Sequence, residues 1–231
     1  MVDQLLSRRA RYRAATREEA KVIALRQLAA GGGEAVSLNA MGKEMGISGP
    51  ALYRYFASRD ALLTELIVDA YGDLAAATEA AEVAAREDDA ATRVRSLAAT
   101  FRAWALAQPH RYLLLYGTPV RGYVAPDGTV ALAQRIFAPI LAALATLPAQ
   151  PLAANPHLSA LDAQLAVSAR ETNQGVSGPV LRRGLVWWTR LHGVLSLEVA
   201  GHFTLMGFDP ALLYEAEVDA LLGGAGVEPT V

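Results

Sequence analysis

The chain has 231 residues, of which 53% are apolar, a formal net charge of −2 and no cysteine. This length allows one large domain or two smaller ones, and the lack of cysteine excludes disulfide frameworks and thiolate metal sites. No segment approaches about 18 uncharged apolar residues, and the N-terminus has no apolar signal-peptide core. The sequence therefore predicts a soluble, cytoplasmic protein without a membrane span.

Basic residues crowd the N-terminus. Residues 1–60 hold ten Lys/Arg against six Asp/Glu, whereas the remaining 171 hold eleven against seventeen. A basic head on an acidic body is typical of a protein that binds DNA with one end. The arginine run ahead of the first predicted helix is either disordered or placed to reach a minor groove or flanking phosphates. Its members are Arg8, Arg9, Arg11, Arg13 and Arg17.

The first predicted helix begins at a capping box of Thr16 and Glu19 and ends at Gly31–Gly33. Three successive glycines predict a flexible joint into the next segment. A phosphate-binding glycine loop is the rival interpretation, but no lysine followed by serine or threonine comes after these glycines.

Residues 37–63 have the pattern of a helix-turn-helix, in which the second helix lies in the DNA major groove. Ser37 is a credible N-cap for the first of the two helices. Leu38, Met41 and Met45 share one face and are expected to pack inward. Gly46 stands where this helix must stop, because glycine adopts a positive φ at little steric cost.

The second helix of the pair is predicted to open at Ser48 or Gly49. Pro50 fits a first turn, where its missing N–H would have no partner in any case. Leu52 and Phe56 stand four residues apart and pack inward. The residues that remain free to contact DNA are Ser48, Ala51, Tyr53, Arg54 and Tyr55.

The segment GISGPALYRYFASRDALL resembles the DNA-binding domain of the tetracycline-repressor (TetR) family, and the resemblance covers about Arg17 to Val68. It implies that Tyr53 and Tyr55 contact phosphates and that Ser37 anchors the first helix to the DNA backbone. Arg59 and Lys43 are further phosphate candidates, and such contacts set orientation rather than sequence.

Base recognition falls to the start of the second helix. The residues expected to read bases are Ser48, Gly49, Pro50, Ala51 and Arg54. Arg54 alone among them can make a bidentate contact with guanine, so we expect modest direct readout together with indirect readout of DNA shape.

Beyond the head, the pattern predicts further helices and an all-α protein of about nine to ten helices. The expected helices span residues 60–85, 91–107, 109–116, 129–147, 158–169, 180–203 and 210–222, with loops at 118–128 and 173–178. The predicted domains are a helix-turn-helix domain with its basic arm at residues 1–62 and a ligand-binding and dimerisation domain at residues 63–231.

An acidic cluster lies at Glu87, Asp88 and Asp89. Paired aspartates hold magnesium in all-α enzymes of the terpene-cyclase kind. The favoured interpretation is a helix start, where acidic side chains complement the helix dipole.

The last two predicted helices are apolar nearly all round, which indicates burial on several sides and hence a partner subunit as cover. The resemblance implies that these helices pair in a homodimeric four-helix bundle. Trp188, His192 and Gly193 also resemble the signature of a subgroup of C-terminal domains. Gly193 and Gly201, eight residues apart, are expected to share a face and to allow close helix approach.

Aromatic residues of the second domain are candidates for a pocket that holds a small apolar or aromatic ligand, although aromatic residues at helical spacing more often form a core. The candidates are Phe101, Trp104, Tyr112, Tyr116, Phe137, Trp187, Trp188 and His192. Glu198 and His202 stand four residues apart, but no third ligand at useful spacing supports a metal site. No metal, cofactor or catalytic constellation is expected, so the chain is not predicted to be an enzyme.

The sequence thus predicts a homodimeric, ligand-responsive transcriptional regulator, acting as a repressor on a pseudo-palindromic double-stranded operator. The alternative is an all-α lipid-binding protein or enzyme with a vestigial helix-turn-helix.

Overall fold

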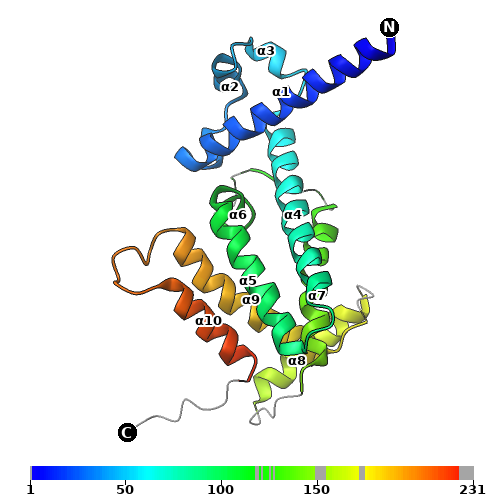
Figure 1. Ribbon diagram of the computed structural model, residues 1–231, viewed down its shortest axis with the longest axis vertical. Helices are drawn as coiled ribbons and strands as arrows, with labels where there is room; N and C mark the ends of the chain where they lie inside the picture. Colours follow the sequence, from blue (N-terminus) through cyan, green and yellow to red (C-terminus); the bar gives the residue numbers. More distant parts are fainter. Residues whose placement is uncertain are drawn as a thin grey trace. The chain divides into compact units, whose positions relative to one another are not determined.

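The computed structural model describes residues 2–117, 120, 122–124, 126, 128–148, 155–171 and 175–223, with side chains from Arg8 onward. Within these residues the chain is all-α, as predicted, with ten α-helices, one 3-10 helix (η1) and no strand (Figure 1). The elements are α1 (Val2–Gly31), η1 (Gly33–Ala35), α2 (Leu38–Glu44), α3 (Gly49–Leu52), α4 (Arg59–Ala84), α5 (Ala90–Ala107), α6 (Pro109–Tyr116), α7 (Gly128–Thr146), α8 (Pro156–Glu171), α9 (Gly178–Val199) and α10 (Pro210–Leu221).

The chain forms two compact units. The first, which we call the head unit, comprises Met1–Gly72 and Gln108–Val130. The second, the body unit, comprises Asp73–Ala107 and Ala131–Val231. Helix α4 contributes its first part to the head unit and its last part to the body unit.

The core of the head unit gathers buried side chains from α1, α2, α3 and the start of α4. Its members are Ala20, Ile23, Ala24, Val36, Leu38, Met41, Leu52, Phe56, Leu62, Leu63 and Leu66. Leu38 and Met41 of α2 and Leu52 of α3 point inward as their spacing predicts. Burying these apolar side chains holds the two short helices in place, because neither is long enough to be stable alone.

The first helix begins much earlier than predicted. Helix α1 starts at Val2, so the arginine run is part of a helix and not an arm ahead of one. The predicted cap at Thr16 is wrong, since its hydroxyl donates to the Tyr12 carbonyl oxygen at 2.9 Å, a bond made inside a helix. Threonine serves both roles, and the sequence pattern does not distinguish them.

The glycines at 31–33, of which Gly31 is the last residue of α1, do not form the predicted flexible joint. Gly32 has a φ of 67°, which ends the helix, and Gly33 opens the 3-10 turn. A Cβ added at Gly33 would lie 2.4 Å from a methyl carbon of Val120. The joint is therefore a packed corner in which glycine is required by close approach.

Residues 108–130 belong to the head unit by contact, although the sequence assigns them to the domain at residues 63–231. Helix α6 packs against α1, and Tyr116 meets Tyr71 edge to face at 6.3 Å. The hydroxyl groups of Tyr123 and Thr64 are 3.0 Å apart. These contacts join segments some 45 to 90 residues apart. A local sequence pattern does not predict contacts between segments so far apart.

The body unit packs around α9, which contacts α5, α8 and α10. Helices α9 and α10 lie side by side as an antiparallel hairpin (Figure 1). Large buried side chains fill this core: Phe101, Trp104, Ile136, Ile140, Trp187, Leu191, Leu195, Tyr214 and Val218.

Ion pairs with little exposure link the helices of the body unit. Arg102 of α5 donates to Glu198 of α9, with its Nε 3.0 Å from Oε2, and its guanidinium lies 5.9 Å from the centre of the Tyr214 ring. The bond to Glu198 raises the pKa of Arg102. Arg182 of α9 pairs with Asp162 of α8 at 2.7 Å.

The acidic cluster at residues 87–89 is a helix start, as the favoured interpretation holds. The Asp89 carboxylate accepts bonds from the backbone amides of Ala91 and Thr92 and from the Thr92 hydroxyl, at 2.9 to 3.0 Å. These bonds, with Thr92 foremost, lower the pKa of Asp89. The side chain is thus fully used in opening α5.

The ninth helix ends four residues before the predicted limit at Phe203. Helix α9 stops at Val199, and Gly201 takes a φ of 78° in the turn that follows. Gly193 and Gly201 therefore do not share a helical face, and that expectation is wrong. A left-handed glycine just past a helix end is a common way to stop a helix.

Among the described residues, helix α7 alone is long and apolar enough, by length and composition, to cross a membrane, although it contains the charged residue Arg135. One such helix is weak evidence for a span. Its Arg135 makes two bonds to the Glu79 carboxylate, at 2.8 and 2.9 Å. Ile136 and Ile140 are buried within the body unit.

Candidate DNA-binding site and ligand cavity

The helix-turn-helix forms as the local chemistry predicts. The Ser37 hydroxyl accepts the Ala40 amide at 3.3 Å and so caps α2. Gly46 has a φ of 67° in the turn between the helices. Helix α3 opens at the N-cap Ser48 with Pro50 in its first turn. It is shorter than predicted: regular helix ends at Leu52, a turn follows at residues 53–55, and Phe56 lies just after this turn.

The structure separates the predicted DNA contacts by exposure. Exposed are Ser37, Lys43, Ser48, Pro50, Tyr53 and Arg54, and half-buried are Gly49, Ala51, Tyr55 and Arg59. Tyr53 is 48% exposed, so its side chain is accessible, as a phosphate contact requires. Gly49 stands so close to α2 that an added Cβ would lie 2.3 Å from the Asn39 side-chain oxygen.

Two predicted contacts have roles within the head unit. Tyr55 packs against the head core, so it is not turned away from it as expected. Arg59 donates to the carbonyl oxygen of Gly33, which ties the start of α4 to the corner after α1.

The arginines of α1 fall into two groups. Arg8, Arg9, Arg11 and Arg13 are exposed. Arg17, one turn beyond Arg13, donates to the Tyr55 carbonyl oxygen and to Glu65, and its guanidinium lies 4.6 Å from the centre of the Phe56 ring. It fixes α1 against the segment that follows α3.

Later cations of α1 are matched by carboxylates. Lys21 bonds to Asp69 at 2.6 Å, and Arg26 pairs with Glu44. Burial works against the charge of Lys21, but its bonds to Asp69 and Glu18 outweigh this and raise its pKa. The second half of α1 is therefore electrostatically satisfied within the protein.

Most of the predicted ligand-pocket residues form one aromatic cluster in the body unit. Trp188 stacks on His192 at 4.6 Å and meets Phe137 at 4.8 Å and Phe101 at 5.6 Å. Phe101 also lies 6.2 Å from Trp187. Burial lowers the pKa of His192 and so favours a neutral imidazole.

The remaining predicted pocket residues divide between the units. Trp104 is buried in the body unit, and its indole N–H, like that of Trp187, has no acceptor within the described part of the chain. Tyr112 and Tyr116 belong to the head unit, where their rings lie 5.3 Å apart. Burial is the main cause that raises the pKa of Tyr116.

A cavity of about 700 Å³ lies between α7 and the start of α9, within the body unit. Of the predicted pocket residues, Phe137 lines it. The other lining residues are Gln134, Ala138, Leu141, Ala142, Ala145, Gly175, Val176, Ser177 and Val180. Small apolar side chains of this kind give no distinctive pattern in a sequence, so the sequence analysis missed them.

Among the described residues no group of three or more His, Asp or Glu could hold an ion. Glu198 is bonded to Arg102, and His202 lies beyond the end of α9.

An exposed recognition helix, a basic first helix and a second helical unit with a cavity are together typical of DNA-binding regulators of the helix-turn-helix class. Residues 23–66 match the model of the bacterial regulatory proteins of the tetR family, and residues 94–221 match that of the tetracyclin repressor-like C-terminal domain. The chain belongs to the TetR family and is a DNA-binding transcriptional regulator.

Individual relatives agree with this assignment. The chain is 34% identical to the HTH-type transcriptional regulator Rv1816 of Mycobacterium tuberculosis over 212 residues, which are 88% of this chain and 90% of that one. It is 48% identical to the candidate regulatory protein SCO4313, whose crystal structure superposes with a TM-score of 0.79 over 93% of this chain and 98% of that one. The TetR-family regulator PfmR of Thermus thermophilus, 18% identical, shares the fold with a TM-score of 0.58 over 91% and 98% of the two chains.

TetR-family regulators bind DNA operators and act as dimers, and the family is typically not enzymatic.

Proposed function

We propose that this protein is a homodimeric, cytoplasmic repressor that binds a pseudo-palindromic operator and responds to a neutral, largely apolar ligand. The observation that carries the proposal is the exposed start of α3 beside Tyr53, on a head whose exposed arginines lie along α1. Two such heads bind half-sites about 34–36 Å apart, or a multiple of this. We assign no catalytic step to the chain.

The proposal is tested by selecting bound sequences from a random duplex library at two salt concentrations. A pseudo-palindrome should emerge, and affinity for it should fall steeply as salt rises, because phosphate contacts dominate binding. Tyr53→Phe removes one hydroxyl from an exposed ring and should weaken operator binding without changing the free energy of unfolding. If no sequence is enriched at either salt concentration, operator binding by the free protein is contradicted. That result favours the alternative of a protein with a vestigial helix-turn-helix.

Dimerisation is proposed to use the exposed faces of α9 and α10. Leu185, Gly193 and Leu197 lie on one exposed stripe of α9. A Cβ added at Gly193 would meet nothing within 4 Å, so this position leaves room for a neighbouring backbone. Leu212 and Leu213 of α10 add apolar surface, being 65% and 37% exposed.

A charge on the α9 stripe tests the interface. Leu197→Glu should convert the dimer to a monomer in sedimentation experiments, since a carboxylate buried without a partner opposes association. Val167→Glu, on the exposed surface of α8, is the matched control and should leave the dimer intact. Persistence of the dimer in Leu197→Glu contradicts the use of this face.

The ligand is proposed to bind in the α7–α9 cavity. The lining is mainly apolar, with Gln134 and Ser177 as its polar side chains and no charged group, which favours a neutral ligand. Phe137 connects this cavity to the aromatic cluster, so occupancy should change the fluorescence of Trp188.

Filling the cavity separates ligand binding from DNA binding. Ala142→Phe places a ring in the cavity and should abolish the fluorescence change produced by a panel of neutral aromatic compounds, while operator affinity stays the same. If the compounds change the fluorescence of the wild type and of Ala142→Phe equally, the ligand binds outside the α7–α9 cavity.

A further inference from the structure

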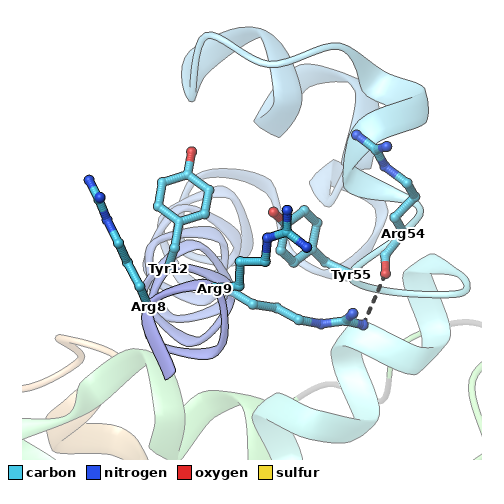
Figure 2. A pocket seen from close by; sticks show the side chains of 6 residues that line it. Arg8, Arg9, Tyr12, Arg54 and Tyr55 are labelled. Carbon is cyan, nitrogen blue, oxygen red and sulfur yellow. Dashed lines mark hydrogen bonds between the residues drawn. The ribbon is translucent and has the colours of Figure 1, made fainter. Parts of the chain in front are cut away.

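A basic groove lies on the head unit between α1 and the segment that follows α3. It encloses about 680 Å³ and is lined by Arg8, Arg9, Tyr12, Arg13, Arg54 and Tyr55. Figure 2 shows the side chains of Arg8 and Tyr12 on one wall and that of Arg54 on the other, with their polar ends directed to the same side of the head. Residues distant in sequence thus form one surface, which we call the arginine groove.

The two walls of the arginine groove are fixed to each other. Arg13 donates to the carbonyl oxygen of Arg54 at 3.3 Å, the bond drawn as a dashed line in Figure 2. Its guanidinium also lies 5.8 Å from the centre of the Tyr55 ring. One turn later, Arg17 donates to the Tyr55 carbonyl oxygen. Helix α1 is therefore held in a set position beside the end of the recognition segment.

Among the residues that the structure describes, no carboxylate neutralises the charge of Arg8, Arg9 or Arg54 in the arginine groove. Its lining holds four guanidinium groups and no carboxylate. Within the part of the chain that the structure describes, Arg8, Arg9 and Arg54 make no ion pair, whereas Arg17, Lys21 and Arg26 farther along α1 all do. A concave site with several unmatched guanidinium groups attracts a polyanion.

We propose that the arginine groove binds the phosphate backbone of DNA that flanks the half-site contacted by α3. This inference rests on the proposed function. A helix is about 10–12 Å wide with its side chains, and the minor groove of B-DNA is only about 6 Å wide. Because α1 is helical from Val2, it cannot enter the minor groove as an extended arm and lies along the backbone instead.

Arg54 has a different role in this arrangement from the one its sequence position predicts. From the sequence it is expected to be the principal reader of bases, whereas in the structure it forms one wall of the arginine groove. It then contributes affinity and orientation, while the apolar start of α3 and the shape of the DNA carry sequence preference.

The test compares an operator duplex obtained by library selection, carrying long flanks, with the same operator trimmed to its half-sites. Arg8→Gln with Arg9→Gln should weaken binding to the flanked duplex at least tenfold and bring it near the affinity for the trimmed duplex. The slope of log affinity against log salt should fall by about 3 to 4 per dimer, since about 0.9 counterion is released per phosphate contact.

Matched variants exclude other causes. Arg86→Gln with Arg170→Gln removes the same charge from exposed positions of the body unit and should leave both affinity and salt slope as in the wild type. Arg8→Lys with Arg9→Lys keeps the charge and should retain most of the flank effect. Arg54→Gln should weaken binding to all operator variants by the same factor.

Three results overturn the proposal. The first is an unchanged affinity and salt slope in the double glutamine variant. The second is a loss confined to flanks rich in A·T pairs, which indicates arginine tips reading the minor groove. The third is a changed base preference within the half-site in the Arg54→Gln variant. If the wild type selects no operator at all, the proposed function itself has failed, and that outcome is distinct from these three.

Discussion

The arginines of the arginine groove have different surroundings from those that join the helices of the body unit. In the body unit, Arg93, Arg95, Arg102, Arg135, Arg182 and Arg190 are each matched with a carboxylate. In the arginine groove of the head unit, the guanidinium groups of Arg8, Arg9 and Arg54 have no carboxylate partner among the described residues. The paired guanidinium groups of the body unit hold its helices together, whereas those gathered in the arginine groove form a concave surface for an anionic partner.

The largest effect on stability is expected when one paired arginine is removed from the body unit. Arg102→Ala leaves Glu198, whose side chain is only 12% exposed, without its partner. We expect the free energy of unfolding to fall by about 2–4 kcal/mol, toward the lower part of the range for broken buried pairs because Arg102 is partly exposed. Urea unfolding followed by tryptophan fluorescence measures this, since all three tryptophans lie in the body unit.

Arg86→Ala, at an exposed position of the same unit, is the control and should change stability by no more than about 0.5 kcal/mol. Equal effects of the two substitutions contradict the structural role of the Arg102–Glu198 pair.

The next effect concerns an unpaired arginine of the head unit. Arg54→Ala should weaken operator binding about tenfold, or about 1.4 kcal/mol, with no change in the unfolding transition. Fluorescence anisotropy with labelled operator, alongside thermal unfolding, measures both quantities. If Arg54→Ala lowers the free energy of unfolding without lowering operator affinity, Arg54 stabilises the head unit and does not bind DNA.

The body unit is also expected to disfavour the protonation of a buried histidine side chain. Burial lowers the pKa of His192 below 6.5, so the unfolded chain takes up a proton there more readily than the folded one. The resulting stability is complete above pH 6.5 and is lost as pH falls from 6.5 through the pKa of the folded state. His192→Gln should flatten stability against pH over this interval, and an unchanged slope assigns the acid sensitivity to other groups.

The smallest effect is expected for a paired but exposed arginine. The side chains of Arg95 and Asp219 are 52% and 55% exposed, so solvent and salt screen their attraction. Arg95→Ala should lower the free energy of unfolding by no more than about 1 kcal/mol, and 1 M salt should remove the difference. A loss as large as that of Arg102→Ala shows that pairing matters regardless of burial.

The helix-turn-helix was predictable because its signals are local. The cap at Ser37, the positive φ of Gly46 and the opening of α3 at Ser48 each depend on a residue's own chemistry and its next few neighbours. The family resemblance depends on the same short segment. All three features were confirmed.

The expectations that failed involve residues distant in the chain or with two possible roles. Thr16 bonds within a helix and does not begin one, and Gly201 stops a helix that its apolar pattern would have continued. The groove formed by Arg8 and Arg54 joins positions 46 residues apart, and no periodicity records such a contact. Packing decides these cases, and a single sequence does not display packing.

The corner at Gly33 has a consequence for genetics. The space that a Cβ would need there is filled by Val120, whose branched side chain has little rotamer freedom to move aside. Replacing Gly33 by alanine is therefore expected to disturb the packing of the head unit and not a direct DNA contact. A screen for mutants that have lost regulation should recover this site together with the recognition helix, and its alleles should be temperature-sensitive, whereas those at Tyr53 should be defective at every temperature.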